Sequence, residues 1–379
     1  MKQRFTAAPR ATVMAASVIT LTTPNASARR FKLVFLVALT VTAVFLPVQS
    51  SHATFSGDNG RIAFRRFLNN DRTWGAVFTI RPNGTGEVQI THPPMGYVDR
   101  NPDVSPDGTR IVFERESVDC GSSCFVDDVF VVNADGSHLT RLTGVGSPNG
   151  TCLPDGGQCN GMPAWSPDGK QIVFSRASGP VVNDTVQRQA LYIMDANGSH
   201  ITRITQQNLP ATGEDTDPQW SPNGEKILFQ RRNVRTARPA DGVAIWTINL
   251  RTGHERRVTP YRLRAGDTPD WSPDGQHILF HDNVDIADRS ANLYTIEPDG
   301  THLKQLTFAS GGLIQYLGSS YSPDGKWITF GRRPATGGPD ADAADVYVMR
   351  VNGTDKEKVT HTVLYDSYPD WGPSTNSTH

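Results

Sequence analysis

Four aspartates, one asparagine and one tyrosine recur at equivalent points of the sequence, a few residues before segments such as NPDVSPDG or TPDWSPDG. They are Asp99, Asn160, Asp215, Asp267, Tyr316 and Asp366. Carboxylate and amide oxygens suit hard cations such as calcium, and carboxylates also bind basic peptide groups. The alternative is that each Asp caps the turn into the next strand by accepting backbone N–H groups. The sequence leaves both interpretations open.

A second set of aspartates lies in a repeated Ser-Pro-Asp-Gly segment, at Asp107, Asp168, Asp274 and Asp324. The segment lacks the D-x-D-x-D-G spacing and the final Glu of an EF-hand, so we assign these residues to turns. The ten histidines show no H-E-x-x-H spacing. We therefore expect no cofactor, with calcium at the first set of residues as the alternative.

The four cysteines form two closely spaced pairs, Cys120 with Cys124 and Cys152 with Cys159. An even number of cysteines in an exported chain favours disulfides, and four cysteines allow three connectivities. Zinc is the alternative, but the C-x₂-C spacing and accompanying histidines are missing. The sequence predicts disulfides that rigidify two loops.

A sequence repeat must position all these residues. WSPDGKQIVF (165–174) has close copies that begin at 104, 220, 271 and 321, and a degenerate copy at 55–64. A second motif ending in Thr, such as DGSHLTRLT (135–143), recurs with the same period. The spacing of about 50–60 residues is typical of propeller blades. Pro, Asp and Gly predict a type I turn followed by a left-handed glycine.

Each period predicts four β-strands, which in the third unit cover 162–165, 170–176, 190–195 and 200–205. The first unit supplies 61–66, 75–81 and 87–91, and the chain ends with one extra first strand, YDSYPDWGP (365–373). We therefore predict an all-β, six-bladed β-propeller of four-stranded blades, closed by a C-terminal inner strand that joins the N-terminal strands of blade one. The recurrent tryptophans, such as Trp165 and Trp220, are predicted to pack between blades.

Three motifs carry a family resemblance: Pro-x-Trp-Ser-Pro-Asp-Gly-x-x-Ile-x-Phe, Leu-Tyr-x-Met-Asp-x-x-Gly and a terminal Leu-Thr. Together they resemble the TolB-type (WD-repeat-like) six-bladed propeller over about residues 55–373. TolB itself carries an α/β domain before its propeller and acts with the lipoprotein Pal, and this chain resembles the propeller alone. Related peptidase propellers precede a hydrolase domain, but the chain contains no G-x-S-x-G nucleophile elbow.

The N-terminal segment has a sequence pattern unlike that of the repeat. Arg29, Arg30 and Lys32 precede an apolar run of about fourteen residues (33–46), and small residues follow up to Ala53. This pattern predicts a secretory signal cleaved after Ala53, since the run is shorter than the roughly 20 residues that span a bilayer. We thus expect a signal segment at 1–53, a propeller at 54–373 and a disordered tail at 374–379. The chain would be periplasmic, envelope-bound or extracellular.

The composition and the repeat favour binding over catalysis. The net charge of −1 gives no reason to expect nucleic acid as a partner. The long loops that enter the inner strands, and those joining strands two and three, would share one face near the channel mouth, where binding residues usually lie. We expect a monomeric, exported protein that recognises a protein or peptide there. The alternative is a propeller-type polysaccharide lyase or glycoside hydrolase, which a carboxylate pair with a raised pKa would favour.

Overall fold

The computed structural model describes residues 55–118, 126–144, 158–178, 181–182, 185–186, 189–205, 214–232, 242–266, 268–282, 290–310, 314–334 and 343–375. The chain divides into two compact units, Met1–Gln49 and Ser50–His379, and all described residues belong to the second. The predicted signal at 1–53 therefore lies outside the described residues. Within the described ranges, no helix is both long enough and apolar enough to cross a membrane.

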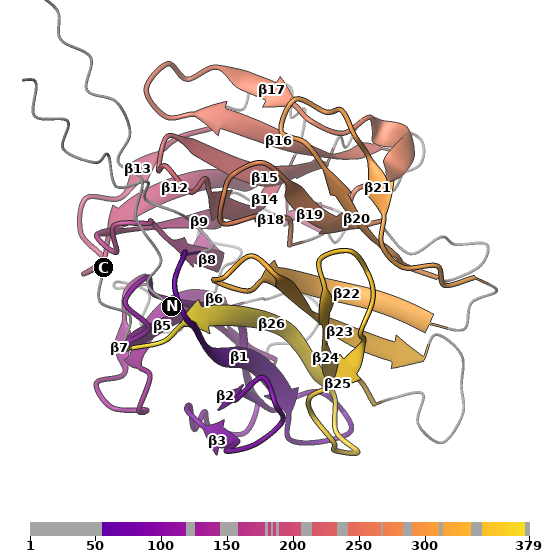
Figure 1. Cartoon of the computed structure of the whole chain (residues 1–379). Helices are drawn as coiled ribbons and strands as arrows, with labels where there is room; N and C mark the ends of the chain where they lie inside the picture. Colours follow the sequence, from indigo (N-terminus) through magenta and orange to yellow (C-terminus); the bar gives the residue numbers. More distant parts are fainter. Residues whose placement is uncertain are drawn as a thin grey trace, which may run out of the picture. The chain divides into compact units, whose positions relative to one another are not determined.

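The fold is built almost entirely from antiparallel β-strands (Figure 1). Four sheets have four strands each: β8 (Gln158–Trp165), β9 (Gln171–Ser178), β12 (Gln189–Asp195) and β13 (Thr202–Arg203); β14 (Glu214–Trp220), β15 (Lys226–Arg232), β16 (Val243–Asn249) and β17 (Glu255–Arg257); β18 (Asp270–Trp271), β19 (Ile278–His281), β20 (Leu293–Ile296) and β21 (Lys304–Gln305); β22 (Ile314–Tyr321), β23 (Trp327–Pro334), β24 (Asp345–Arg350) and β25 (Glu357–Lys358). A short hairpin, β10 (Val181–Val182) and β11 (Thr185–Val186), and one 3₁₀ turn, η3 (Tyr261–Leu263), lie between strands.

The remaining strands form one eight-stranded sheet. They are β26 (Asp366–Pro373), β1 (Asn59–Phe67), β2 (Gly75–Ile80), β3 (Val88–Gln89), β4 (Tyr97–Val104), β5 (Arg110–Ser117), β6 (Val126–Asn133) and β7 (Thr140–Arg141). The C-terminal strand β26 pairs antiparallel with β1, and β2 meets β4 through one parallel bridge, between Gly75 and Val98. The propeller fold agrees with the sequence prediction, but the structure has four separate four-stranded sheets where the sequence predicts six. The Gly75–Val98 bridge accounts for this difference in the number of separate sheets, because it joins strands that the sequence assigns to two blades.

The Ser-Pro-Asp-Gly segments are turns, as predicted. In the third unit, Ser166 Oγ donates to Asp168 Oδ1 at 2.7 Å and accepts the Gln171 N–H at 2.9 Å. Gly169 has a φ of +66°, and a Cβ there would lie 3.3 Å from the Pro106 ring of the preceding turn. Glycine is therefore required both by the backbone conformation and by the close stacking of successive turns.

The terminal Thr of the second motif explains why the fourth strands are short. β13 holds two residues, although the sequence predicts a strand over 200–205. Beyond those two residues, Thr205 Oγ1 accepts the Leu191 N–H at 3.0 Å. The same contact recurs at Thr91, Thr143, Thr259, Thr307 and Thr360. A side-chain hydroxyl thus replaces the backbone ladder at the sheet edge.

The core lies between neighbouring sheets. Trp220 of β14, for example, packs with Val173 of β9 and Leu191 of β12. Trp165, Trp220, Trp271 and Trp371 are all buried, as predicted for residues between blades. The Ser-Pro-Asp-Gly turns follow the inner strands, so they define one side of the molecule, the turn face. The connections from a fourth strand to the next inner strand lie at the opposite ends of the strands and define the linker face.

Candidate functional site

The five predicted site residues that the structure describes lie in inner strands, and four of them face an arginine of the neighbouring strand. Asp99 in β4 accepts two hydrogen bonds from Arg115, at 2.6 Å to Nε and 2.8 Å to Nη2. Asp215 in β14 makes the same paired contact with Arg231, at 2.6 and 2.9 Å. Each aspartate is fully or almost fully buried.

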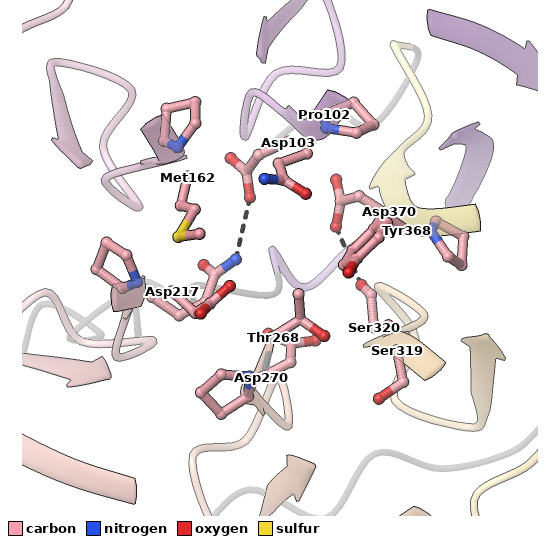
Figure 2. Close-up of a pocket in the computed structure, with 17 residues that line it drawn as sticks. Pro102, Asp103, Met162, Asp217, Thr268, Asp270, Ser319, Ser320, Tyr368 and Asp370 are labelled. Carbon is pink, nitrogen blue, oxygen red and sulfur yellow. Dashed lines mark hydrogen bonds between the residues drawn. The ribbon is translucent and has the colours of Figure 1, made fainter. Parts of the chain in front are cut away.

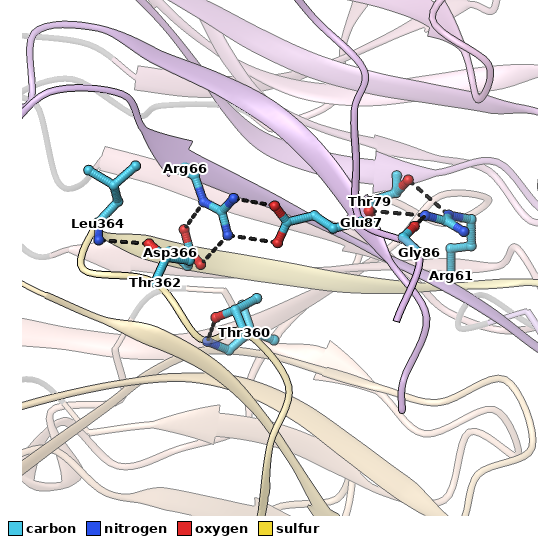
Figure 3. Close-up of polar contacts among 10 residues, drawn as sticks. Arg61, Arg66, Thr79, Gly86, Glu87, Thr360, Thr362, Leu364 and Asp366 are labelled. Carbon is cyan, nitrogen blue, oxygen red and sulfur yellow. Dashed lines mark hydrogen bonds and ion pairs between the residues drawn. The ribbon is translucent and has the colours of Figure 1, made fainter. Parts of the chain in front are cut away.

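Two further predicted residues repeat this arrangement with variations. Asp366 in β26 accepts from Arg66 at 2.7 and 2.8 Å, and Arg66 also donates to Glu87 at 2.9 Å (Figure 3). Asn160 in β8 takes the aspartate position and accepts from Arg176 Nε at 2.6 Å. The structure therefore pairs each of these side chains with an arginine of its own sheet, and Asn160 also donates to Asp128 Oδ1 of a neighbouring sheet at 3.3 Å.

The arginines also lie over aromatic rings of the same sheet. The Arg115 guanidinium is 4.8 Å from the centre of the Phe130 ring, and Arg231 is 5.0 Å from that of Trp246. Cation–π contact and paired hydrogen bonds together hold the linker-face end of each inner strand. A ligand role for the paired aspartates stays a prediction.

The other predicted residues differ. Tyr316 in β22 is buried and packs edge-on against Phe330, with ring centres 5.6 Å apart. Asp267, Cys120, Cys124 and Cys152 lie outside the described residues. Cys159 lies in β8 and takes part in a disulfide, while the identity of its partner stays a prediction.

A cavity lies where the inner strands converge, and the sequence prediction did not include its residues (Figure 2). Its wall contains six residues with a left-handed φ of +48° to +55°, of which five lie at bulges of inner strands and Thr268 lies just before β18. They are Asn101, Met162, Asp217, Thr268, Gly318 and Tyr368. Proline follows all of them except Gly318. Proline suits a bulge because the bulge leaves one residue outside the ladder and proline has no N–H to pair.

Three aspartates at the third bulge position link one inner strand to the next. Asp103 accepts the Trp165 N–H, Asp270 accepts the Tyr321 N–H and Asp370 accepts the Val104 N–H, each at 2.8 Å. These bonds connect β4 to β8, β18 to β22, and β26 to β4. The axial aspartates, as we call Asp103, Asp270 and Asp370, therefore join inner strands at three junctions.

The environment of two axial aspartates, Asp103 and Asp370, favours their neutral forms. Burial raises the pKa of Asp370 to about 6. Burial also raises the pKa of Asp103, and the nearby carboxylates of Asp370 and Asp270 raise it further. Burial is the largest cause in both residues.

The cavity itself is narrow. It encloses about 60 Å³, roughly the volume of two water molecules. Pockets that hold drug-sized ligands measure about 300–1,000 Å³. Within the described residues, no group of three carboxylate, histidine or cysteine side chains is placed to hold a metal ion. The geometry suits the end of one polar side chain better than a whole small molecule.

One signal in the sequence could have identified the cavity. The dipeptide Pro-Asp occurs before the inner-strand aromatic or valine residue in NPDV, TPDW and YPDW, and the equivalent positions hold Ala164, Gln219 and Ser320. This position varies between units while the surrounding motif does not. The predicted residues lie farther upstream instead. Without knowledge of the bulge, the sequence does not show which side chains of an inner strand face the axis.

Parts of three known proteins are similar in sequence to this chain. YuxL, an uncharacterized peptidase of Bacillus subtilis (strain 168), is 31% identical over 128 residues, which cover 33% of this chain and 18% of YuxL. The Tol-Pal system protein TolB of Alcanivorax borkumensis is 36% identical over 90 residues, which cover 24% and 18%. Atu1656, an uncharacterized protein of Agrobacterium fabrum, is 31% identical over 222 residues, which cover 56% and 62%. The chain thus spans under a fifth of YuxL and TolB and under two thirds of Atu1656.

Among solved structures, TolB from Acinetobacter baumannii superimposes with a TM-score of 0.59 at 16% identity, over 90% of this chain and 76% of TolB. At that identity the likeness shows the β-propeller fold alone. No protein-family model matches the chain.

Proposed function

We propose that this chain is an exported six-bladed β-propeller that binds a protein partner on its linker face. The eight-stranded sheet counts as two blades, β26-β1-β2-β3 and β4-β5-β6-β7, because only the Gly75–Val98 bridge joins them. The six residues with left-handed φ around the axis support the same count.

The observation that carries the proposal is the placement of the most exposed large apolar side chains. Met95, Phe308 and Val363 are 75%, 78% and 86% exposed. Met95 lies between β3 and β4, Phe308 between β21 and β22, and Val363 between β25 and β26. All three thus lie on connections from a fourth strand to the next inner strand, at three successive junctions of the ring. Exposed apolar side chains that share one face are typical of an interaction surface.

Export is part of the proposal. It is supported by the basic residues and the apolar run at 29–53, which have the order of a secretory signal. The partial similarity to TolB, a Tol-Pal system protein, is consistent with a protein of the cell envelope.

A carbohydrate-active enzyme is the second candidate, because Asp103 and Asp370 both have raised pKa values, as the acid of a glycosidase requires. The volume of the cavity favours binding instead. A space of about 60 Å³ does not admit a sugar ring together with an attacking water.

The test is a pull-down from the host's envelope extract with the full chain and the single variants Met95→Asp, Phe308→Asp and Val363→Asp. The matched control is Leu303→Asp, an exposed apolar residue of the same blade as Phe308 but outside the linker. We expect one protein to be captured by wild type and by the control and lost at least tenfold with the linker variants. Equal capture by all variants, or turnover of an oligosaccharide, would refute the proposal.

A further inference from the structure

The lining of the axial cavity is acidic. Of the described residues that line it, Asp103, Asp217, Asp270 and Asp370 are acidic, and none is Lys, Arg or His. Two arginines lie close by, but their guanidinium groups have other partners. Arg100 pairs with Glu114 and Glu116, at 2.7 and 2.9 Å. Arg65 donates to Ser367 Oγ at 2.7 Å and lies over the Tyr368 ring.

Closure of the ring does not require this charge. The positions equivalent to the axial aspartates hold Ala164, Gln219 and Ser320 in the other inner strands, and those strands fold with the same bulge. Each axial aspartate accepts a main-chain N–H, but the carboxylates lie close enough that Asp370 and Asp270 raise the pKa of Asp103. A cation among them would relieve this repulsion, so the three aspartates suggest a cationic ligand rather than a requirement of the fold.

Two hydroxyl groups in the same cavity wall lack partners among the described residues. Ser319 is 4% exposed, and its Oγ makes no hydrogen bond. Thr268 Oγ1 is also buried without a partner. Figure 2 shows both residues on the wall of the cavity. A hydroxyl oxygen can accept a hydrogen bond, so both groups can accept one from a ligand that enters the cavity.

The chain itself covers the turn-face side. Gly57 N–H donates to the Pro323 carbonyl at 3.3 Å, and the Asp58 carbonyl accepts the Ser374 N–H at 2.8 Å. Phe55 is 7% exposed and belongs to the same apolar cluster as Trp165 of β8. The segment Phe55–Asp58 thus bridges the turn-face ends of two sheets that are three blades apart, whereas the proposed partner binds on the linker face.

We propose that the axial cavity binds an alkylammonium group, a lysine side chain or an amino terminus, that the partner inserts from the linker face. This inference rests on the proposed function, because it names the chemistry of the partner. An ammonium group has three N–H donors and no acceptor, which matches a ring of carboxylate and hydroxyl oxygens. Its head group and last methylene are of the size that a space of two waters admits.

The probe is n-butylammonium, titrated into the full chain and followed by NMR shifts or calorimetry. We expect saturable binding that Asp370→Asn weakens at least tenfold, or about 1.4 kcal/mol. The matched control is Asp355→Asn, which removes one charge from an exposed aspartate side chain (61%) in the connection between β24 and β25. Tetramethylammonium carries the same charge but no N–H group and is too large, so it should not displace n-butylammonium.

Ser319→Ala separates binding from folding. Its hydroxyl has no partner in the free protein, so the variant should keep or slightly raise the unfolding temperature while it weakens n-butylammonium binding several-fold. Equal affinity in Asp370→Asn, Ser319→Ala and Asp355→Asn would overturn the inference. Calcium that binds with the same dependence on Asp370 and excludes n-butylammonium would also overturn it, in favour of a metal.

The inference and the proposed function can fail separately. If the linker variants lose the partner but Asp370→Asn captures it at wild-type levels, the result supports binding on the linker face and contradicts the ammonium site. If n-butylammonium binds as expected while the linker variants still capture the partner, the result supports the ammonium site and contradicts the proposed linker-face surface.

Discussion

Removal of the Asp99 carboxylate should destabilise the protein strongly, because it leaves Arg115 buried without a counter-ion. The Asp99 side chain is fully buried and the Arg115 side chain is 12% exposed, with two hydrogen bonds between them. Breaking a buried ion pair from one side typically costs about 3–5 kcal/mol. For a chain of this size we expect Asp99→Ala to lower the unfolding temperature by roughly 4–7 °C.

The other sheets supply graded comparisons within the same chain. Asp366→Ala should cost less, about 2–3 kcal/mol, because Arg66 keeps Glu87 as a partner at 2.9 Å. Asp99→Asn should cost only about 1–2 kcal/mol, because the chain already uses an amide opposite Arg176, at Asn160. Thermal and urea unfolding measure each difference.

The control is Asp71→Ala, which removes an exposed carboxylate and should shift stability by less than about 0.5 kcal/mol. The reasoning is refuted if Asp99→Ala behaves like Asp71→Ala, or if Asp99→Asn costs as much as Asp99→Ala. Either result would mean that the stability of the inner strands does not depend on the pairing of these charges.

Two more predictions follow from single residues. Burial raises the pKa of Asp370 to about 6 from an ordinary value near 3.8, so the folded chain retains a proton that the unfolded chain releases. The unfolding free energy should therefore fall as pH rises from about 4 to 6, by up to about 3 kcal/mol relative to Asp370→Asn, and a flat difference between the two pH profiles would contradict this. Gly161→Ala should cost about 1–3 kcal/mol, because a Cβ would lie 2.5 Å from the buried Glu114 Oε2. Gly253→Ala, with open space but a φ of +69°, should cost only about 1 kcal/mol, and calorimetric unfolding of both variants checks the order.

The repeat made most of the fold predictable. Ser-Pro-Asp-Gly fixes a turn through local backbone chemistry, and the Phe that follows, such as Phe174 or Phe229, is fully buried in every unit. The short fourth strands were not predictable, because a Thr hydroxyl that ends a ladder looks the same in sequence as one more strand residue. The bridge between Gly75 and Val98 depends on how close two sheets come, which no local pattern specifies.

The candidate site was predicted less well, for a definite physical reason. Side chains alternate across a strand, and each bulge shifts that alternation by one residue. Asp99 and Asp103 are four residues apart, so simple alternation would place both on one side of β4. The bulge at Asn101 separates them, and Asp99 faces Arg115 while Asp103 faces the axis. The sequence contained both carboxylates but not the bulge that assigns them different roles.

Variation between the units of one chain separates what the fold requires from what it only permits. The turn Ser, the terminal Thr and the buried Phe recur almost without exception, and each has a structural contact that explains it. The third bulge position is Asp, Ala, Gln, Asp, Ser and Asp in successive inner strands, and the linkers are equally varied. Since the same backbone forms with each of these residues, the fold does not select their charge or their exposed apolar groups. A single partner with a basic group and an apolar surface would account for both the acidic axis and the apolar linkers.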